Sequence, residues 1–320
     1  MSPRDALPLR WTEILGLTPV PERLRQTAMA LRGDAHVPPS KAGLSSLRLL
    51  NPRLALPLWR GRYAVPRQVV LTNLFNHTPT PIEDGWSVRR TQVKDFRGDG
   101  ATYDSHNGTD LCIPVGSVYQ APASGRVVRV VSEFHRGGLK VAIDHGGGLI
   151  TSAAHLARAL VTEGERVERG QAVARTGYSG LDAAATFPFG IPHVHFNVWL
   201  DGVPVDPFAR AWEDEPSLWR GGWPSPQDDD AVSLPPPPED YDEDAVAAAV
   251  ESCRNDEVRE RLRRVDARLR GGQLVFERAY FPTRFTDHRS PYTRAHARSP
   301  RIDLPFSAAR FDGIVFASAR

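Results

Sequence analysis

A chain of 320 residues is longer than one typical domain, so two or three folding units are expected. Its 41% hydrophobic and 24% charged residues are ordinary for a soluble globular protein, and a net charge of +2 gives no reason to expect a nucleic acid partner. No stretch approaches the ~18–20 continuous apolar residues of a transmembrane helix. The first residues lack a continuous apolar run, so no secretory signal peptide is predicted.

The first part of the chain, residues 1–67, is predicted to be a partly helical extension. Leu24, Ala28 and Leu31 recur at helical spacing. This pattern predicts a helix over residues 21–32 with those three side chains on one apolar face. The rest of the extension is interrupted by proline and is expected to be irregular.

The central domain is expected to span residues 68–210 and to be mainly β. Short apolar runs alternate with glycine-containing turns, and patterns of helical length are missing. This rhythm is typical of an antiparallel sheet, and we predict an antiparallel β-sandwich. The predicted strands cover residues 68–75, 125–131, 140–144, 149–155, 171–175 and 193–200.

The composition changes after residue 210. Acidic side chains outnumber basic ones eleven to one between residues 213 and 244, and a run of four prolines interrupts them. Residues 211–239 are therefore predicted to form an exposed linker. A helix is expected over residues 240–270 and should end at the glycine pair 271–272. Together with an arginine-rich tail, it makes up a C-terminal part at residues 240–320.

Two short motifs place metal-binding side chains at suggestive spacing. His106 and Asp110 lie four positions apart, and His193 and His195 lie two apart on a predicted strand, so both imidazoles point the same way. Histidine nitrogen and aspartate oxygen are donors that zinc takes at roughly 2.0–2.2 Å. Three protein ligands with a fourth position left to water are typical of a hydrolytic site.

The order of three motifs resembles that of the lysostaphin/LytM-type zinc endopeptidases. The chain has H-x-G-x-D at residues 106–110, A-H-L at residues 154–156 and P-H-x-H-F at residues 192–196. The resemblance covers about residues 96–210. It implies a lysostaphin-like β-sandwich built from a duplicated hybrid motif, one Zn²⁺ ion, and hydrolysis of peptide bonds in bacterial cell-wall peptidoglycan.

The resemblance also implies a role for each polar residue. His106, Asp110 and His195 would be the metal ligands, and His155 and His193 would be catalytic residues beside the ion. One of these two imidazoles would take a proton from water and pass it to the leaving amine. The other would orient the water or bind the oxyanion. Which imidazole does which stays open.

Other polar residues are less clearly functional. His145 lies in a glycine-rich turn and is predicted to be structural, whereas His77 could line the cleft. Many relatives have tyrosine where this chain has Ala153, so a hydroxyl is missing there. Tyr178 could supply one or could simply pack. It opens residues 178–192, a loop longer than is usual in the family and expected to reshape the substrate groove.

The predicted function is zinc-dependent hydrolysis of peptide bonds in peptidoglycan stem peptides or cross-bridges. The main alternative is a weak or inactive scaffold of the same fold that binds or regulates cell-wall hydrolases. A biotinyl-like module is disfavoured because no lysine stands at the expected hairpin tip. The partner is expected to be peptidoglycan or another peptide, with the oligomeric state left open. The family works in the cell envelope or outside the cell, and a cytoplasmic location also stays open.

Overall fold

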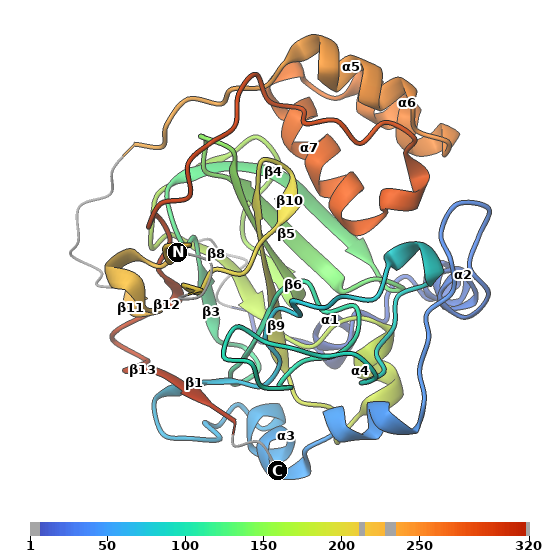
Figure 1. The fold of residues 1–320 in the computed structure, drawn as a ribbon. Helices are drawn as coiled ribbons and strands as arrows, with labels where there is room; N and C mark the ends of the chain where they lie inside the picture. The colour runs from blue at the N-terminus through green and yellow to red at the C-terminus, as the bar shows by residue number, and fades with distance from the viewer. Residues whose placement is uncertain (1–6, 211–214, 228–234, 318–320) are drawn as a thin grey trace.

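The protein is organised around one large β-sheet that is flanked by helices and by segments from both ends of the chain (Figure 1). The computed structural model describes residues 7–210, 215–227 and 235–317. Within these residues, the main sheet has eleven strands. They are β1 (Gln68–Leu71), β2 (Thr109–Cys112), β3 (Val118–Gln120), β4 (Gly125–Glu133), β5 (Gly138–Asp144), β6 (Leu149–Ala159), β7 (Arg166–Val167), β8 (Ala172–Thr176), β9 (His193–Leu200), β10 (Val203–Pro204) and β13 (Gly313–Phe316). Strands β11 (Pro226–Gln227) and β12 (Leu304–Ser307) form a separate pair.

The sheet is mixed rather than purely antiparallel. The main path runs β13-β1-β2-β9-β6-β5-β4-β7, with β10 beside β9 and with β8 between β3 and β6. Most neighbours are antiparallel, but β13 runs parallel to β1. The prediction of a mainly β protein is therefore confirmed. The predicted antiparallel sandwich is not confirmed, because these strands form one mixed sheet. A segment of the C-terminal tail, β13, joins this sheet at its edge.

Both faces of the central strands are buried, because a separate hydrophobic core packs against each of them. On one face, Ala153 and Phe196 belong to a core that also contains side chains from beyond residue 207. These distant members are Phe208, Leu218, Trp219, Ile302, Leu304, Phe306 and Phe311. On the other face, Ile150 and Trp199 pack against helix α7 (Ala267–Tyr280).

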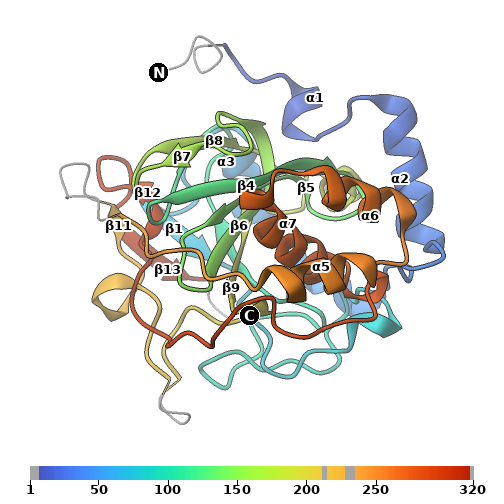
Figure 2. The same cartoon turned by 90° about the horizontal axis from the view of Figure 1, so that it is seen from above.

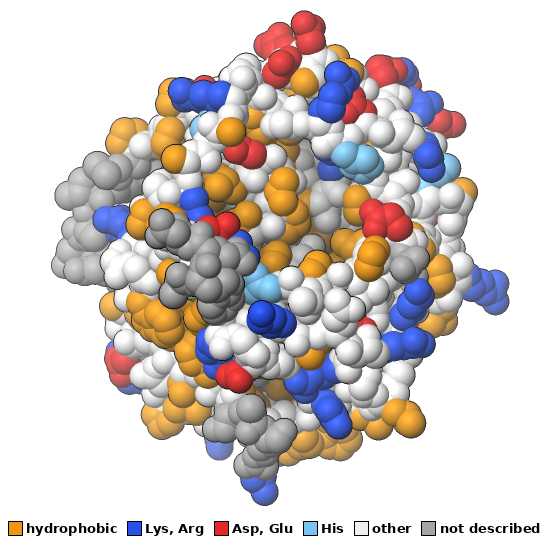
Figure 3. All heavy atoms as spheres, viewed as in Figure 1, with side chains coloured by type: hydrophobic (Ala, Val, Ile, Leu, Met, Phe, Trp, Pro, Cys, Tyr) orange, Lys and Arg blue, Asp and Glu red, His pale blue; other side chains and the backbone are white. Residues whose placement is uncertain are grey.

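The helices lie around this sheet. Besides α7 they are α1 (Trp11–Ile14), α2 (Val20–Arg32), α3 (Pro52–Trp59), α4 (Leu181–Thr186), α5 (Glu243–Glu251) and α6 (Asp256–Arg264). Short 3-10 turns occur at Leu44–Leu49, Ile82–Asp84, Arg220–Gly222 and Pro282–Arg284. None of the helices in the described ranges has the length and apolar character needed to span a bilayer. Figure 3 shows basic and acidic side chains interspersed over one face of the molecule.

The C-terminal helix was predicted wrongly in two respects. Three helices, α5 to α7, take the place of one, and Figure 2 shows them gathered on one side of the sheet. Asp242, Asn255 and Asp266 cap their N-termini with side-chain oxygens. Gly271 and Gly272 lie inside α7 rather than after it. A Cβ on Gly271 would lie 2.5 Å from the Tyr241 ring and one on Gly272 2.6 Å from Val128, so these glycines let the helix approach its neighbours closely.

The N-terminal helix forms where it was predicted, but the prediction of which face is buried was wrong. Leu24 and Leu31 are 67% and 70% exposed, whereas Arg23 and Gln26 are buried. The Arg23 guanidinium donates to the Ser132 carbonyl and hydroxyl at 3.1 and 2.8 Å. The Gln26 side chain accepts from the backbone N–H of Phe134 at 2.7 Å. Polar contacts to the end of β4 therefore hold this helix.

The described parts of the predicted linker are partly buried. Leu218 and Trp219 belong to the core, and Trp223 is about half exposed. Much of the acidic run, at residues 211–214 and 228–234, lies outside the described residues. The tail beyond residue 284 is also part of the fold, because β12 and β13 pair with β11 and β1.

Candidate metal centre

The candidate site lies on the same face of the sheet as helix α7, but at a different position along the strands. Asp110 on β2 lies directly opposite His195 on β9, and His195 lies opposite Ala154 on β6. Residues paired in this way project from the same face of a sheet. His193, two residues from His195, lies on that face as well. The sheet register therefore brings together polar residues that are far apart in the sequence.

Three ligand-type atoms converge at the centre of the site. His106 Nε2 lies 3.0 Å from Asp110 Oδ1 and 3.0 Å from His195 Nδ1, and the last two atoms are 2.9 Å apart. All three residues are buried, with His195 retaining 6% exposure. Gly108 is required between them, because a Cβ there would lie 2.9 Å from His195 Nε2 and 2.7 Å from the Phe196 carbonyl.

Neighbouring polar groups fix the orientation of two of these residues. His106 Nδ1 donates to the Leu74 carbonyl at 2.6 Å, which leaves the lone pair of the neutral ring on Nε2, facing the cluster. Asn73 Nδ2 donates to Asp110 Oδ2 at 2.7 Å, so that Oδ1 is turned inward. The sequence analysis did not identify Asn73, because it lies 37 residues from Asp110 in no recognisable spacing.

His155 and His193 lie side by side next to this cluster, with ring centroids 4.8 Å apart. His155 Nδ1 donates to the Ser179 carbonyl at 2.8 Å, and His193 Nδ1 donates to the Ile191 carbonyl at 2.7 Å. In their neutral forms both rings therefore carry the lone pair on Nε2. His193 Nε2 is 3.5 Å from Asp110 Oδ1. His193 also retains some exposure, which gives solvent a route to the site.

A change of strand pairing places His155 there. Residues 149–154 of β6 pair with β9, whereas residues 156–159 pair with β8. His155 lies between the two segments with φ of +62°, which few residues other than glycine adopt. Its backbone N–H donates to the Gly137 carbonyl at 2.7 Å. Such a backbone conformation persists only where the surrounding structure holds it in place.

The electrostatics keep the aspartate charged and two of the imidazoles neutral. Burial acts to raise the pKa of Asp110, but the rings of His106 and His193 outweigh it, so this pKa lies well below its usual range. Burial lowers the pKa of His195 to about 4. Burial, with the His193 ring beside it, also holds the pKa of His155 well below the usual value for histidine.

This donor set fits a zinc ion. Two imidazole nitrogens and one carboxylate oxygen are donors that zinc accepts, and ligands of a tetrahedral zinc lie about 3.3 Å apart. The observed separations of 2.9–3.0 Å are close to that value. Among the residues that the structure describes, His106, Asp110 and His195 are the group identified as able to hold a metal ion.

Other residues singled out from the sequence have different places. His145 is fully buried and bonds with the Ser124 carbonyl and the Thr151 hydroxyl, in agreement with a structural role. His77 pairs with Asp206 at 2.7 Å. Tyr178 packs against the rings of His155 and His193, with centroid distances of 5.3 and 4.9 Å, and burial raises the pKa of its hydroxyl above the usual range. The structure therefore favours packing for Tyr178, and the long loop forms α4.

Residues 104–207 match the model of peptidase family M23. This segment forms a peptidase family M23 domain. It contains the three clustered residues together with His155 and His193.

Curated relatives and solved structures are similar to this part of the chain. The M23 domain region is 36% identical over 101 residues to the peptidoglycan DD-endopeptidase ShyA of Vibrio cholerae, a match that covers 32% of this chain and 22% of ShyA. It is 30% identical over 122 residues to a lipoprotein NlpD/LppB homolog of Pseudomonas aeruginosa, covering 38% and 37%. A crystal structure of a zinc containing peptidase from Vibrio cholerae is 28% identical, with a TM-score of 0.32 and coverage of 44% and 38%. The chain thus spans about a fifth to two fifths of the length of these relatives.

Proposed function

We propose that this protein is a zinc-dependent endopeptidase that hydrolyses peptide bonds in peptidoglycan stem peptides or cross-bridges. The observation that carries the proposal is the convergence of His106 Nε2, Asp110 Oδ1 and His195 Nδ1 within 3.0 Å of one another. The M23 domain match supports peptidase chemistry, and the name of the ShyA relative supports peptidoglycan as the substrate.

In this proposal His106, Asp110 and His195 hold the ion. Zinc bound there would act as a Lewis acid toward a substrate carbonyl and toward water. Asn73 and the Leu74 carbonyl keep the ligands in their binding orientation through the hydrogen bonds described above. Such partners reduce the reorganisation that ion binding would otherwise require.

His155 and His193 supply the proton transfers. With Nδ1 fixed on a backbone carbonyl, the Nε2 atom of each ring is the one available to exchange a proton with water or substrate. One imidazole accepts a proton from the attacking water and passes it to the leaving amine. The other, once protonated, donates a hydrogen bond to the oxyanion of the tetrahedral intermediate. The 4.8 Å between their centroids lets both serve one scissile bond.

A second candidate function is regulation of cell-wall hydrolases by a weakly active or inactive domain. The resemblance drawn from the sequence leads us to expect tyrosine where this chain has Ala153, so a hydroxyl is missing at that position. The presence of all five polar residues weighs against this alternative.

The test combines metal analysis with a hydrolysis assay. Zinc content and the fragments released from purified sacculi are measured by mass spectrometry for the wild type, His106→Ala, Asp110→Ala and the exposed control His288→Ala. We expect both site variants to lose zinc and activity together, and the control to keep both. Full zinc stoichiometry in both site variants would contradict the ligand assignment. Zinc-loaded wild type that releases nothing would favour the regulatory alternative.

A further inference from the structure

The N-terminal extension reaches the candidate metal centre through one backbone segment. Residues 177–180 follow strand β8, and two of their N–H groups donate to the end of helix α1. The Tyr178 N–H donates to the Ile14 carbonyl at 3.1 Å, and the Gly180 N–H donates to the Leu15 carbonyl at 3.2 Å. Ile14 and Tyr178 also belong to the same hydrophobic core. A part of the chain outside the M23 domain therefore holds a segment inside it.

An ion pair fixes α1 on the strand that carries His155. Arg158 lies three residues after His155 on β6, and its Nε and Nη2 atoms donate to the two carboxylate oxygens of Glu13, each at 2.8 Å. A carboxylate that accepts from two N–H groups of one guanidinium has a fixed orientation. The Arg10 N–H also donates to Glu13, at 3.0 Å. The ion pair thus ties the position of α1 to that of β6.

Ser179 is the residue through which α1 acts on the site. It is fully buried, its carbonyl accepts from His155 Nδ1 at 2.8 Å, and its N–H donates to the His155 carbonyl at 3.3 Å. Gly16 lies directly against it, because a Cβ added to Gly16 would be 2.8 Å from Ser179 Cβ. No free space therefore separates the N-terminal extension from the residue that orients His155.

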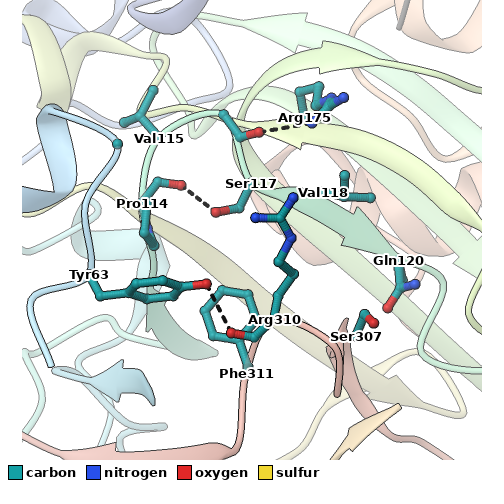
Figure 4. A pocket seen from close by; sticks show the side chains of 12 residues that line it. Tyr63, Pro114, Val115, Ser117, Val118, Gln120, Arg175, Ser307, Arg310 and Phe311 are labelled. Carbon is teal, nitrogen blue, oxygen red and sulfur yellow. Dashed lines mark hydrogen bonds between the residues drawn. The ribbon is translucent and has the colours of Figure 1, made fainter. Parts of the chain in front are cut away.

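The start of the segment is held by a different part of the chain. The Thr176 N–H donates to the Ser117 carbonyl and the Gly116 N–H donates to the Thr176 carbonyl, both at 2.9 Å. Figure 4 shows this loop beside Arg175, whose guanidinium donates to the Gly116 carbonyl at 3.1 Å. None of these contacts involves α1. Loss of the contacts with α1 should therefore displace residues 178–180 while β8 stays paired.

We propose that residues 10–16 position His155 for the reaction by holding the Ser179 carbonyl against its Nδ1 atom. A neutral imidazole carries a proton on one nitrogen and a lone pair on the other, and this hydrogen bond selects the tautomer with the lone pair on Nε2. Without the hydrogen bond, the ring would also populate the other tautomer, in which Nε2 cannot accept a proton. The effect on turnover rests on the proposed hydrolysis, whereas the choice of tautomer does not.

The test compares Gly16→Ala with Gly221→Ala. Both glycines have φ of +70°, so alanine introduces a similar backbone strain, but a Cβ on Gly221 would meet nothing within 4 Å. We expect Gly16→Ala to displace Ser179 and to lower kcat at least tenfold, with zinc content and KM unchanged. Gly221→Ala should stay within twofold of the wild type. Equal effects of the two substitutions, or an unchanged kcat for Gly16→Ala, would overturn the proposal.

A measurement without substrate separates this proposal from the proposed hydrolysis. The chemical shifts of the imidazole nitrogens distinguish the two tautomers by nuclear magnetic resonance, and His155→Gln identifies the His155 signals by their loss. We expect the Nδ1–H tautomer in the wild type and in Gly221→Ala, and a mixture of tautomers in Gly16→Ala. This change in a protein that hydrolyses nothing would contradict the hydrolysis and support the positioning. The same tautomer in all three proteins would overturn the positioning, whatever the activity.

A milder pair of variants serves if Gly16→Ala does not fold, as judged by thermal unfolding. Glu13→Gln removes the charge that pairs with Arg158 but keeps the size of the side chain. Glu22→Gln is its matched control, because Glu22 forms an ion pair with Arg25 at 2.8 Å on the surface of α2. We expect Glu13→Gln to lower kcat at least threefold and to introduce the second tautomer, and Glu22→Gln to change neither. Equal results for the two variants would overturn the role of α1.

Discussion

Replacing Asn73 with alanine is expected to weaken zinc binding although Asn73 is not one of the proposed ligands. Its Nδ2 donates to Asp110 Oδ2 at 2.7 Å and so keeps Oδ1 turned toward His106 and His195. A hydrogen bond to a charged group contributes about 1.5–3 kcal/mol. Since each 1.4 kcal/mol corresponds to a factor of ten, the zinc Kd should rise about 10- to 100-fold. The fold should persist, because the Asn73 carbonyl still accepts from the Asp110 N–H at 2.8 Å.

The assay is competition for zinc with a chromophoric chelator, which needs no substrate. Asn255→Ala is a matched control, because Asn255 caps α6 by accepting from the Val258 N–H at 3.0 Å. Losing that cap should cost about 1 kcal/mol of stability without changing the zinc Kd. A zinc Kd for Asn73→Ala within twofold of the wild type would refute the idea that this amide positions the carboxylate. An equal rise in both variants would show that loss of stability alone is responsible.

Three further predictions concern turnover and stability. His193→Ala should lower kcat by ~10²–10⁴ while zinc content stays at wild-type level, as measured by steady-state kinetics and metal analysis; a change of only a few-fold would remove the proton-transfer role. Because burial lowers the pKa of His145 to about 4, the unfolded chain takes up a proton near pH 6.5 before the folded chain does. His145 alone should thus lower the free energy of unfolding by about 3 kcal/mol between pH 6.5 and 4, and in denaturant titrations His145→Gln should show a fall that is smaller by this amount, because the other buried histidines keep their own contributions. Leu304→Ala in the tail should lower the free energy of unfolding by about 2–5 kcal/mol, since Leu304 is fully buried. Leu44→Ala, at an exposed position, should change it by no more than about 0.5 kcal/mol. Equal losses in the two variants would show that the tail does not belong to the core.

The sequence was sufficient to predict the parts of the site that depend on short spacing. His193 and His195 alternate along β9, whose bounds at residues 193–200 were predicted correctly, and the strand places both imidazoles on one face. The joint order of motifs also identified His106 and Asp110. Asn73 could not be found in this way, because its contact with Asp110 depends on the pairing of β1 with β2 and not on any local pattern.

The rest of the fold depended on tertiary contacts that leave little trace in local patterns. Gly271 and Gly272 suggested a helix end, yet close packing against Tyr241 and Val128 is what requires them. The apolar positions of α2 suggested a buried face, but Arg23 and Gln26 make the contacts with β4. Parallel pairing of β13 with β1 joins residues more than 240 positions apart, which periodicity cannot indicate.

Helix α7 is linked to the loop that carries His106 through a short relay of side chains. The Tyr280 hydroxyl donates to Asn197 Oδ1 at 3.0 Å, and Asn197 Nδ2 donates to the carbonyl of Asn107 at 2.9 Å, next to His106. During synthesis, all three proposed ligands leave the ribosome more than eighty residues before Tyr280. The loop therefore acquires this support only after helix α7 has been synthesised, which would delay assembly of a competent centre until Tyr280 can pack against Asn197.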